Sequence, residues 1–209
     1  MKHVTSAIQS FHQIATAPCI SKKSNDGKQK LGQLLSGIPM FNANDIAEIQ
    51  NSFIGQGQFG KVRIVTLKKL SVVVACKNLN DQLSSKNDVL AELITGLTLS
   101  GGRHFPFVYG LLNNFSILME YFRNVALNEP KAAPNLWTWV KGKPSAKDLQ
   151  TKLCYVLDAV IYMHSFKILH NDLKADNFIY SEECVKLVDF GKGESNINFS
   201  SQSISYTTR

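Results

Sequence analysis

Apolar and polar residues alternate along the first half of the chain in short runs that end at glycine-rich or lysine-rich turns. A helix is predicted at residues 87–99, where an apolar stripe recurs at helical spacing and two glycines follow. Strands are predicted by β-branched runs at 52–55, 61–67 and 70–77, and a hairpin by 107–112 and 115–121. The first half is therefore expected to form a sheet with one helix.

One long helix dominates the pattern of the second half. Ser145 followed by Asp148 is a helix-start signal of the capping-box kind, and the apolar period continues to residue 165. The positions expected to face the core are Leu149, Leu153, Val156, Val160 and Met163. After the helix, the pattern predicts a polar loop at 170–177, a small hairpin at 178–188, and an exposed loop at 192–209.

Residues 1–50 are expected to be an N-terminal extension and linker, because the lysine-rich segment 21–30 has the composition of a linker. The first 19 residues have apolar positions at roughly helical spacing and no continuous apolar block, which argues against export. They also lack acidic residues, which keeps a mitochondrial presequence conceivable, although the absence of arginine argues against it.

Composition places the chain among ordinary globular proteins, with 209 residues of which 44% are apolar and 19% charged. The net charge of +7 allows acidic or phosphate-bearing partners but names no ligand, and no nucleic-acid partner is expected. The four cysteines include no close pair, which favours a reducing compartment, and we expect a cytoplasmic protein. Apolar runs are far shorter than the ~20 residues of a membrane helix, so no span is expected.

A glycine-rich turn follows the first predicted strand. Gly55, Gly57 and Gly60 form the pattern G-x-G-x-x-G, and glycine lets backbone amides approach phosphate oxygens closely. In dinucleotide-binding folds the third glycine opens a helix, whereas here a β-branched strand follows at 61–67. The pattern therefore favours a phosphate-binding strand–turn–strand over a nicotinamide site, with a plain glycine hairpin as the alternative.

Two charged residues stand at regular distances after this turn. Lys77 closes an apolar strand, where burial of its stem would hold its ammonium near phosphates bound by the glycines. Glu92 lies within the predicted helix and could pair with Lys77. Taken alone, each residue fits a solvated position better, because most lysines and glutamates lie in water.

Polar residues cluster in the loop at 170–177 and just after the hairpin. The segment HNDLKADN brings two aspartates, two asparagines and a lysine together, and Asp189-Phe190-Gly191 follows. Short loops flanking one hairpin can converge on a polyphosphate and its metal ions. Together with the glycine turn, Lys77 and Glu92, this combination predicts phosphoryl-transfer chemistry.

The chain resembles the eukaryotic protein kinases over residues 51–191, through GQGQFGKV, VACK, HNDLKADN and DFG. The resemblance implies an α+β, two-lobe fold with ATP bound between the lobes. The N-lobe, residues 51–123, would hold a five-stranded antiparallel sheet and one helix. Residues 124–209 would form a partial, mostly helical C-lobe.

The resemblance also implies roles for individual residues. Asp172 would accept the proton of the acceptor hydroxyl, Lys174 would neutralise the moving phosphoryl group, and Lys77 paired with Glu92 would hold phosphates. Asn177 and Asp189 would bind magnesium. Lys174 in this loop is typical of kinases that act on serine and threonine of protein substrates. The nucleotide would contact Ile54, Gly55, Gln56, Gly57, Gln58, Phe59 and Gly60 in the glycine turn, Val62 and Ala75 above the adenine, Phe178 below it, and Met119, Glu120 and Phe122 at its edge.

Three departures from the family pattern bear on activity and its regulation. Asn171 replaces the arginine that receives an activation-loop phosphate, and Gly96 replaces a bulky residue that would hold the helix. The chain also reaches Arg209 without an Ala-Pro-Glu element, so a truncated kinase is expected. A catalytically impaired nucleotide-binding or scaffolding module is the alternative. A small-molecule kinase is a third hypothesis, and the oligomeric state is open.

Overall fold

The computed structural model describes residues 37–57, 60–79, 86–113, 116–123, 133–180 and 184–195. Several sequence predictions lie outside these residues: the helical spacing at 1–19, the linker at 21–30, the contacts of Gln58 and Phe59, and the tail beyond residue 195. No helix in the described part of the chain has the length and apolarity needed to cross a membrane.

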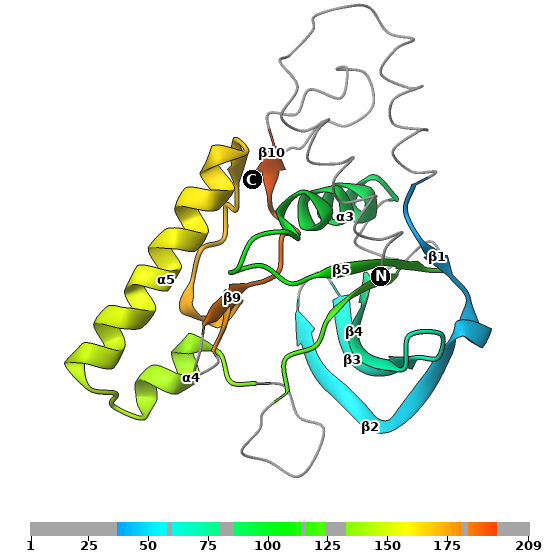
Figure 1. Ribbon diagram of the computed structural model, residues 1–209, viewed down its shortest axis with the longest axis horizontal. Helices are drawn as coiled ribbons and strands as arrows, with labels where there is room; N and C mark the ends of the chain where they lie inside the picture. The colour runs from blue at the N-terminus through cyan, green and yellow to red at the C-terminus, as the bar shows by residue number, and fades with distance from the viewer. Residues whose placement is uncertain are drawn as a thin grey trace, which may run out of the picture.

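A curled six-stranded sheet forms the first lobe (Figure 1). Its strands are β1 (Met40–Phe41), β2 (Ile46–Gly57), β3 (Gly60–Leu67), β4 (Val72–Leu79), β5 (Val108–Leu112) and β6 (Ser116–Glu120). They lie in the order β1-β5-β6-β4-β3-β2, and all neighbours are antiparallel except β1 and β5. The expected five-stranded antiparallel sheet is therefore corrected to a mixed sheet of six strands.

The sheet begins earlier than the sequence pattern indicated. β1 and the first five residues of β2 precede residue 51, so the expected boundary between extension and domain falls inside a strand. A short 3-10 helix, η1 (Ala43–Asp45), turns the chain between the two strands. Asn42 caps it, since its side chain accepts from Asn44 N while Asp45 accepts from Asn42 N. This capped turn ends β1 and leads the chain into β2.

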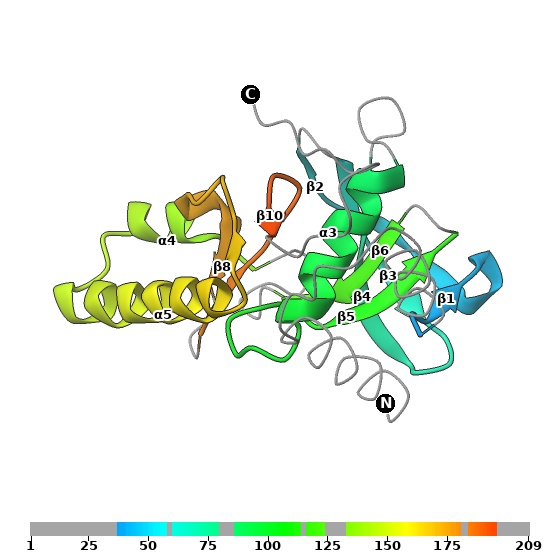
Figure 2. The same cartoon turned by 90° about the horizontal axis from the view of Figure 1, so that it is seen from above.

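The helix α3 (Lys86–Leu99) crosses one face of the sheet (Figure 2). Its apolar stripe is buried as the periodicity predicted, and it packs against β5, β6 and the segment before β1. The buried members of this cluster are Ile38, Val89, Leu93, Ile94, Leu97, Val108, Leu111 and Ile117. A second cluster of buried apolar side chains lies on the opposite face of the sheet, so the sheet is packed on both faces.

The described part of the second lobe contains two α-helices, one 3-10 helix and two pairs of short strands. Its elements are α4 (Leu136–Lys141), α5 (Ala146–Ser165), β7 (Ile168–Leu169), η2 (Ala175–Asn177), β8 (Phe178–Tyr180), β9 (Val185–Leu187) and β10 (Glu194–Ser195). β8 and β9 form the predicted hairpin. β10 pairs with β7, so the expectation of a loop from residue 192 is wrong for residues 194–195.

The long helix begins as predicted but presents a different face to the core. Ser145 caps it by accepting from Asp148 N. Of the five positions expected to be buried, only Met163 is, and Leu149 and Leu153 are exposed. The buried face instead contains Lys152, Ala159 and Met163. The exposed face carries a second apolar stripe, Leu149, Leu153, Leu157 and Ile161.

Candidate nucleotide and phosphoryl-transfer site

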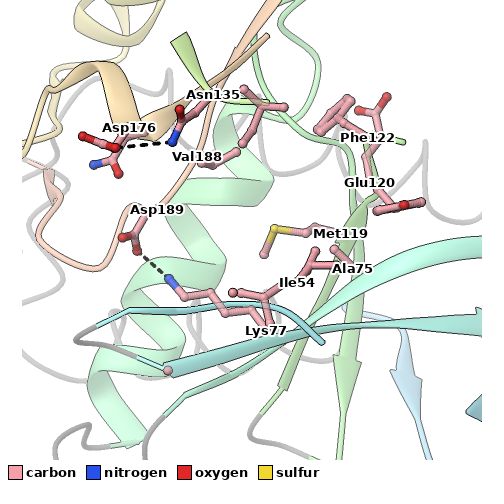
Figure 3. A pocket seen from close by; sticks show the side chains of 16 residues that line it. Ile54, Ala75, Lys77, Met119, Glu120, Phe122, Asn135, Asp176, Val188 and Asp189 are labelled. Carbon is pink, nitrogen blue, oxygen red and sulfur yellow. Dashed lines mark hydrogen bonds and ion pairs between the residues drawn. The ribbon is translucent and has the colours of Figure 1, made fainter. Parts of the chain in front are cut away.

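A cleft of about 380 Å³ lies between the sheet and the second lobe (Figure 3). Its walls come from the turn between β2 and β3, from β4, from the connection after β6, and from the loops around the β8–β9 hairpin. The lining residues that the sequence predicted are Ile54, Gly55, Gly60, Val62, Ala75, Lys77, Met119, Glu120, Phe122, Asn177 and Asp189. Residues separated by more than a hundred positions thus surround one cavity.

Strand alternation directs Lys77 into this cleft. Ala75 and Lys77 are two residues apart on β4, so their side chains share the face that lines the cavity. Lys77 Nζ donates to Glu92 Oε1 at 2.5 Å and to Asp189 Oδ1 at 2.6 Å. The side chains of Lys77 and Glu92 are buried, whereas that of Asp189 is 31% exposed. One ammonium therefore joins α3 to the second lobe at the end of the cleft.

The charges of this cluster depend on one another. Burial by itself would lower the pKa of Lys77, but the carboxylates of Glu92 and Asp189 raise it above its ordinary value. Burial raises the pKa of Glu92, and Lys77 opposes that effect. Because Lys77 faces two carboxylates at hydrogen-bonding distance, the ammonium is the form that the cluster stabilises.

Asp172 lies on the loop before η2, next to the cleft but outside its lining. Its Oδ2 accepts from Lys174 Nζ at 2.9 Å and from Asn177 Nδ2 at 3.4 Å, and Lys192 Nζ lies 3.5 Å from Oδ1. The hydrogen bond from Lys174 and the nearby positive charges keep the pKa of Asp172 below its ordinary value. Asp172 is therefore an ionised carboxylate able to accept a hydrogen bond.

Asn177 and Asp189 both line the cleft, and a backbone hydrogen bond holds their two segments together. Val188 N donates to Asn177 O at 2.9 Å, and Asp189, which has a positive φ of 68°, accepts a hydrogen bond from Lys77 Nζ. The amide of Asn177 donates from Nδ2 to Asp172 O at 2.9 Å, which leaves its oxygen for a cation. One amide oxygen and one carboxylate suit Mg²⁺, which completes its shell with water and phosphate oxygens. The described residues contain no cluster of three or more His, Cys, Asp or Glu side chains arranged for a metal.

Phe178 does not close the cleft as expected. Its side chain is buried in the core of the second lobe, where it pairs across the hairpin with Leu187, and Ile179 lines the cleft instead. Neighbouring residues of a strand point to opposite faces, so only one of the two can face the cavity. The prediction was wrong by one residue, which exchanges the two faces of the strand.

Sequence reasoning missed five lining residues: Tyr121, Asn135, Asp176, Ile179 and Val188. The strand alternation at 178–180 could have indicated Ile179. The signal at Asn135 is that of a helix start, because its side chain caps α4 by accepting from Thr138 N. Its Nδ2 also donates to Asp176 at 3.3 Å (Figure 3). No spacing along the chain predicts that contact.

Glu92 and Lys174 also lie outside the cavity lining. Glu92 is behind Lys77, and Lys174 is half-exposed beside Asp172. Gln56 and Gly57 belong to β2, whose backbone continues to the glycine turn. Gly96 lies against Val108, and a cavity of about 20 Å³ opens between that region and Phe190. α3 nevertheless packs through the buried stripe described above, so Gly96 does not detach it from the sheet.

The fold and the site define a two-lobed protein with a polar cluster at the end of an apolar interlobe cleft. The family model of the protein kinase domain matches residues 49–208, and the chain belongs to this family. The recognised resemblance and the kinase-like fold are thereby confirmed.

Curated relatives agree with the family. The chain is 29% identical over 150 residues to serine/threonine-protein kinase SBK2 of Mus musculus, covering 66% of this chain and 38% of that protein. It is 28% identical over 177 residues to human cGMP-dependent protein kinase 2, covering 78% and 21%. It is 31% identical over 174 residues to L-type lectin-domain containing receptor kinase IX.2 of Arabidopsis thaliana, covering 75% and 24%. The chain thus spans well under half the length of these relatives.

Proposed function

We propose that the protein transfers the γ-phosphoryl group of ATP to serine or threonine hydroxyls of protein substrates. The observation that carries this proposal is the cluster of Lys77, Glu92 and Asp189 at the polar end of an apolar cleft. Family membership and relatives named as serine/threonine kinases support it.

The cleft has the chemistry of a nucleotide site. Its apolar part, with Ile54, Val62 and Ala75 on one side and Ile179 on the other, fits a flat aromatic base. The backbone of Glu120 and Phe122 would offer hydrogen-bonding groups to the edge of that base. Lys77 at the opposite end would then meet the phosphates, where a buried ammonium interacts more strongly than one in water.

Asn177 and Asp189 are the residues that would hold magnesium, whose charge would offset that of the phosphates. The donor set fits, because an amide oxygen and a carboxylate are hard oxygen ligands. Lys77 already neutralises part of the charge on Asp189. The same carboxylate would therefore orient both the lysine and the cation.

The reaction would proceed at Asp172. The acceptor oxygen would form a bond to the γ-phosphorus while the bond from that phosphorus to the β–γ bridging oxygen breaks, releasing ADP. The acceptor's proton would pass to the Asp172 carboxylate, and Lys174 would stabilise the charge on the moving phosphoryl group. Lys174, two residues after the aspartate, supports serine and threonine over tyrosine as acceptors.

A nucleotide-binding or scaffolding module without transfer activity is the second candidate. The exposed apolar stripe of α5 favours it, because a surface of this kind is suited to protein contacts. The two candidates share the nucleotide site and differ in phosphoryl transfer.

The deciding experiment incubates the purified chain with magnesium and γ-labelled ATP and a library of serine, threonine and tyrosine peptides. Asp172→Asn is the matched control, because it keeps the shape of the side chain. Label on serine and threonine peptides, lost in Asp172→Asn, supports transfer. Saturable ATP binding without label supports the module, and absence of both contradicts the proposal.

A further inference from the structure

Lys186 forms a contact between the lobes that the nucleotide site does not require. It lies at the centre of β9, its side chain is 15% exposed, and it does not line the cleft. Its Nζ donates to Phe105 O at 3.1 Å and lies 3.4 Å from Glu120 Oε2. The Phe105 side chain packs in the core of the second lobe, whereas Glu120 belongs to the sheet of the first lobe, so the contact with Glu120 links the two lobes.

The carboxylate that Lys186 contacts is itself held in place. Glu120 ends β6, and its Oε2 accepts from Phe107 N at 3.0 Å. The backbone of Glu120 also donates to Phe107 O at 2.7 Å. Both the side chain and the backbone of Glu120 are therefore tied to the segment before β5.

The same ammonium reaches the far end of the interlobe connection. Lys186 Nζ lies 5.4 Å from the centre of the Phe122 ring, a cation–π distance. Glu120 and Phe122 both line the cleft, at the end away from Lys77 (Figure 3). Lys186 thus contacts the side chains of Glu120 and Phe122 from outside the cleft. In the proposed site, the backbone of these two residues faces the base.

We infer that Lys186 is a positioning residue for the nucleobase, acting through Glu120 and Phe122 while never touching the nucleotide. This inference rests on the proposed function, because it assumes that the cleft binds a purine nucleotide. With Lys186 present, the peptide groups at the base edge are fixed before binding, so less freedom is lost when the base docks. Without it, the hydrogen-bond partner left to the Glu120 carboxylate among the described residues is the Phe107 amide.

The position predicts a loss confined to the base. In Lys186→Met, which keeps the length and apolar stem of the side chain, adenosine should bind about fivefold more weakly, the lower end of couplings between separate sites. Magnesium tripolyphosphate, which has no base, should bind as in the wild type. A general loss of folding would weaken both ligands together, and thermal unfolding checks this directly.

Four further proteins complete the experiment, measured by calorimetric titration: Lys147→Met, Lys186→Arg, Glu120→Gln and the double variant Lys186→Met, Glu120→Gln. Lys147→Met removes an exposed lysine in the first turn of α5 and should change neither affinity. Lys186→Arg keeps the cation and should recover most of the adenosine affinity. In the double variant Lys186→Met, Glu120→Gln, the loss should be smaller than the sum of the two single losses.

The outcomes separate this inference from the proposed function. If the wild type binds adenosine and tripolyphosphate but Lys186→Met binds both equally well, the inference is wrong and the nucleotide site stands. If Lys186→Met weakens both ligands by the same factor, Lys186 is a general structural contact and the inference is also wrong. If the wild type binds neither ligand, the proposed function fails first.

Discussion

Lys77 Nζ lies 2.6 Å from Asp189 Oδ1, although the two residues are 112 positions apart in the chain. This ion pair joins a strand of the first lobe to the loop after β9, and the same ammonium contacts Glu92 on α3. The strand β4, the helix α3 and the loop after β9 therefore meet at the Lys77 side chain, whose positive charge holds two carboxylates together.

Replacing Lys77 by methionine should weaken binding of magnesium ATP by about tenfold to a hundredfold, the range of a lost hydrogen bond to a charged group. Titration of a fluorescent ATP analogue measures the affinity. Because the variant leaves the buried carboxylate of Glu92 unpaired, Lys77→Met combined with Glu92→Gln keeps the fold measurable. Equal affinities of wild type and both variants would show that Lys77 does not contact the nucleotide.

Asp172 and Asp189 should divide the work between acceptor and nucleotide. Asp172→Asn should lower phosphoryl transfer by about 10²- to 10⁴-fold with nearly unchanged ATP affinity, because in the proposed reaction this carboxylate would act on the acceptor and not on the nucleotide. Asp189→Asn should lower both phosphoryl transfer and ATP affinity. The variant would lose a magnesium ligand and the negative charge that pairs with Lys77. Transfer assays and nucleotide titrations with both variants test this, and similar losses of affinity would contradict it.

The sequence predicted the local elements that have strong periodicity or clear end signals. The helix α3, the cap at Ser145 and the β8–β9 hairpin follow from patterns within a few residues. The site residues were found through motifs of a known family, because no spacing brings Lys77 to Asp189. Their contacts in the structure agree with that grouping, while their roles in catalysis remain predictions.

The missed features depend on contacts between distant segments. β1 has only two residues and exists because it pairs with β5, and β10 exists because it pairs with β7. The error at Phe178 arose from choosing one of two adjacent apolar residues without knowing which face of the strand lies over the core. On α5 both faces are apolar, so periodicity could not select the buried one.

His170 should make stability depend on pH. Its Nε2 donates to Val188 O at 3.1 Å, and its buried Nδ1 has no hydrogen-bond partner among the described residues. Burial lowers the pKa of His170, although the Val188 carbonyl and nearby aspartates oppose this effect. The unfolded chain, with a histidine pKa of about 6.5, therefore binds a proton at higher pH than the folded protein.

The free energy of unfolding should consequently be full above about pH 6.5 and fall as the pH drops toward the lowered pKa, by at most about 1.4 kcal/mol per pH unit for this one group. Urea unfolding at several pH values, with His170→Phe for comparison, measures the slope. The variant keeps an aromatic ring against Phe190, 5.3 Å away in the wild type, and removes the titration. Identical slopes in the two proteins would show that His170 is not the group responsible.

Asn171 predicts activity without phosphorylation of the tail. It stands where the kinase family has an arginine that would pair with a phosphate. Its Nδ2 donates instead to Lys192 O at 3.2 Å, and this hydrogen bond joins the loop at 170–177 to the segment after Asp189. The candidate phosphate acceptors Ser201, Ser203, Thr207 and Thr208 lie outside the described residues. Phosphatase treatment should therefore leave transfer activity unchanged, and its collapse would mean that another cation has taken the role of the arginine.

The apolar stripe on the exposed face of α5 should make the 209-residue chain bind apolar dyes and associate with itself. Leu157 and Ile161 are 60% and 67% exposed, and they continue the row formed by Leu149 and Leu153. The double variant Leu157→Gln, Ile161→Gln should lower dye binding and association while changing the free energy of unfolding by no more than ~0.5 kcal/mol per site, because glutamine is a good helix former and the sites are on the surface. Met163→Ala, on the buried face of the same helix, should instead lower the free energy of unfolding by about 2–5 kcal/mol.

Dye fluorescence, sedimentation and urea unfolding distinguish the two faces. A wild-type protein that is monomeric and binds no dye, or a double variant that loses several kcal/mol, would show that this face is covered in solution.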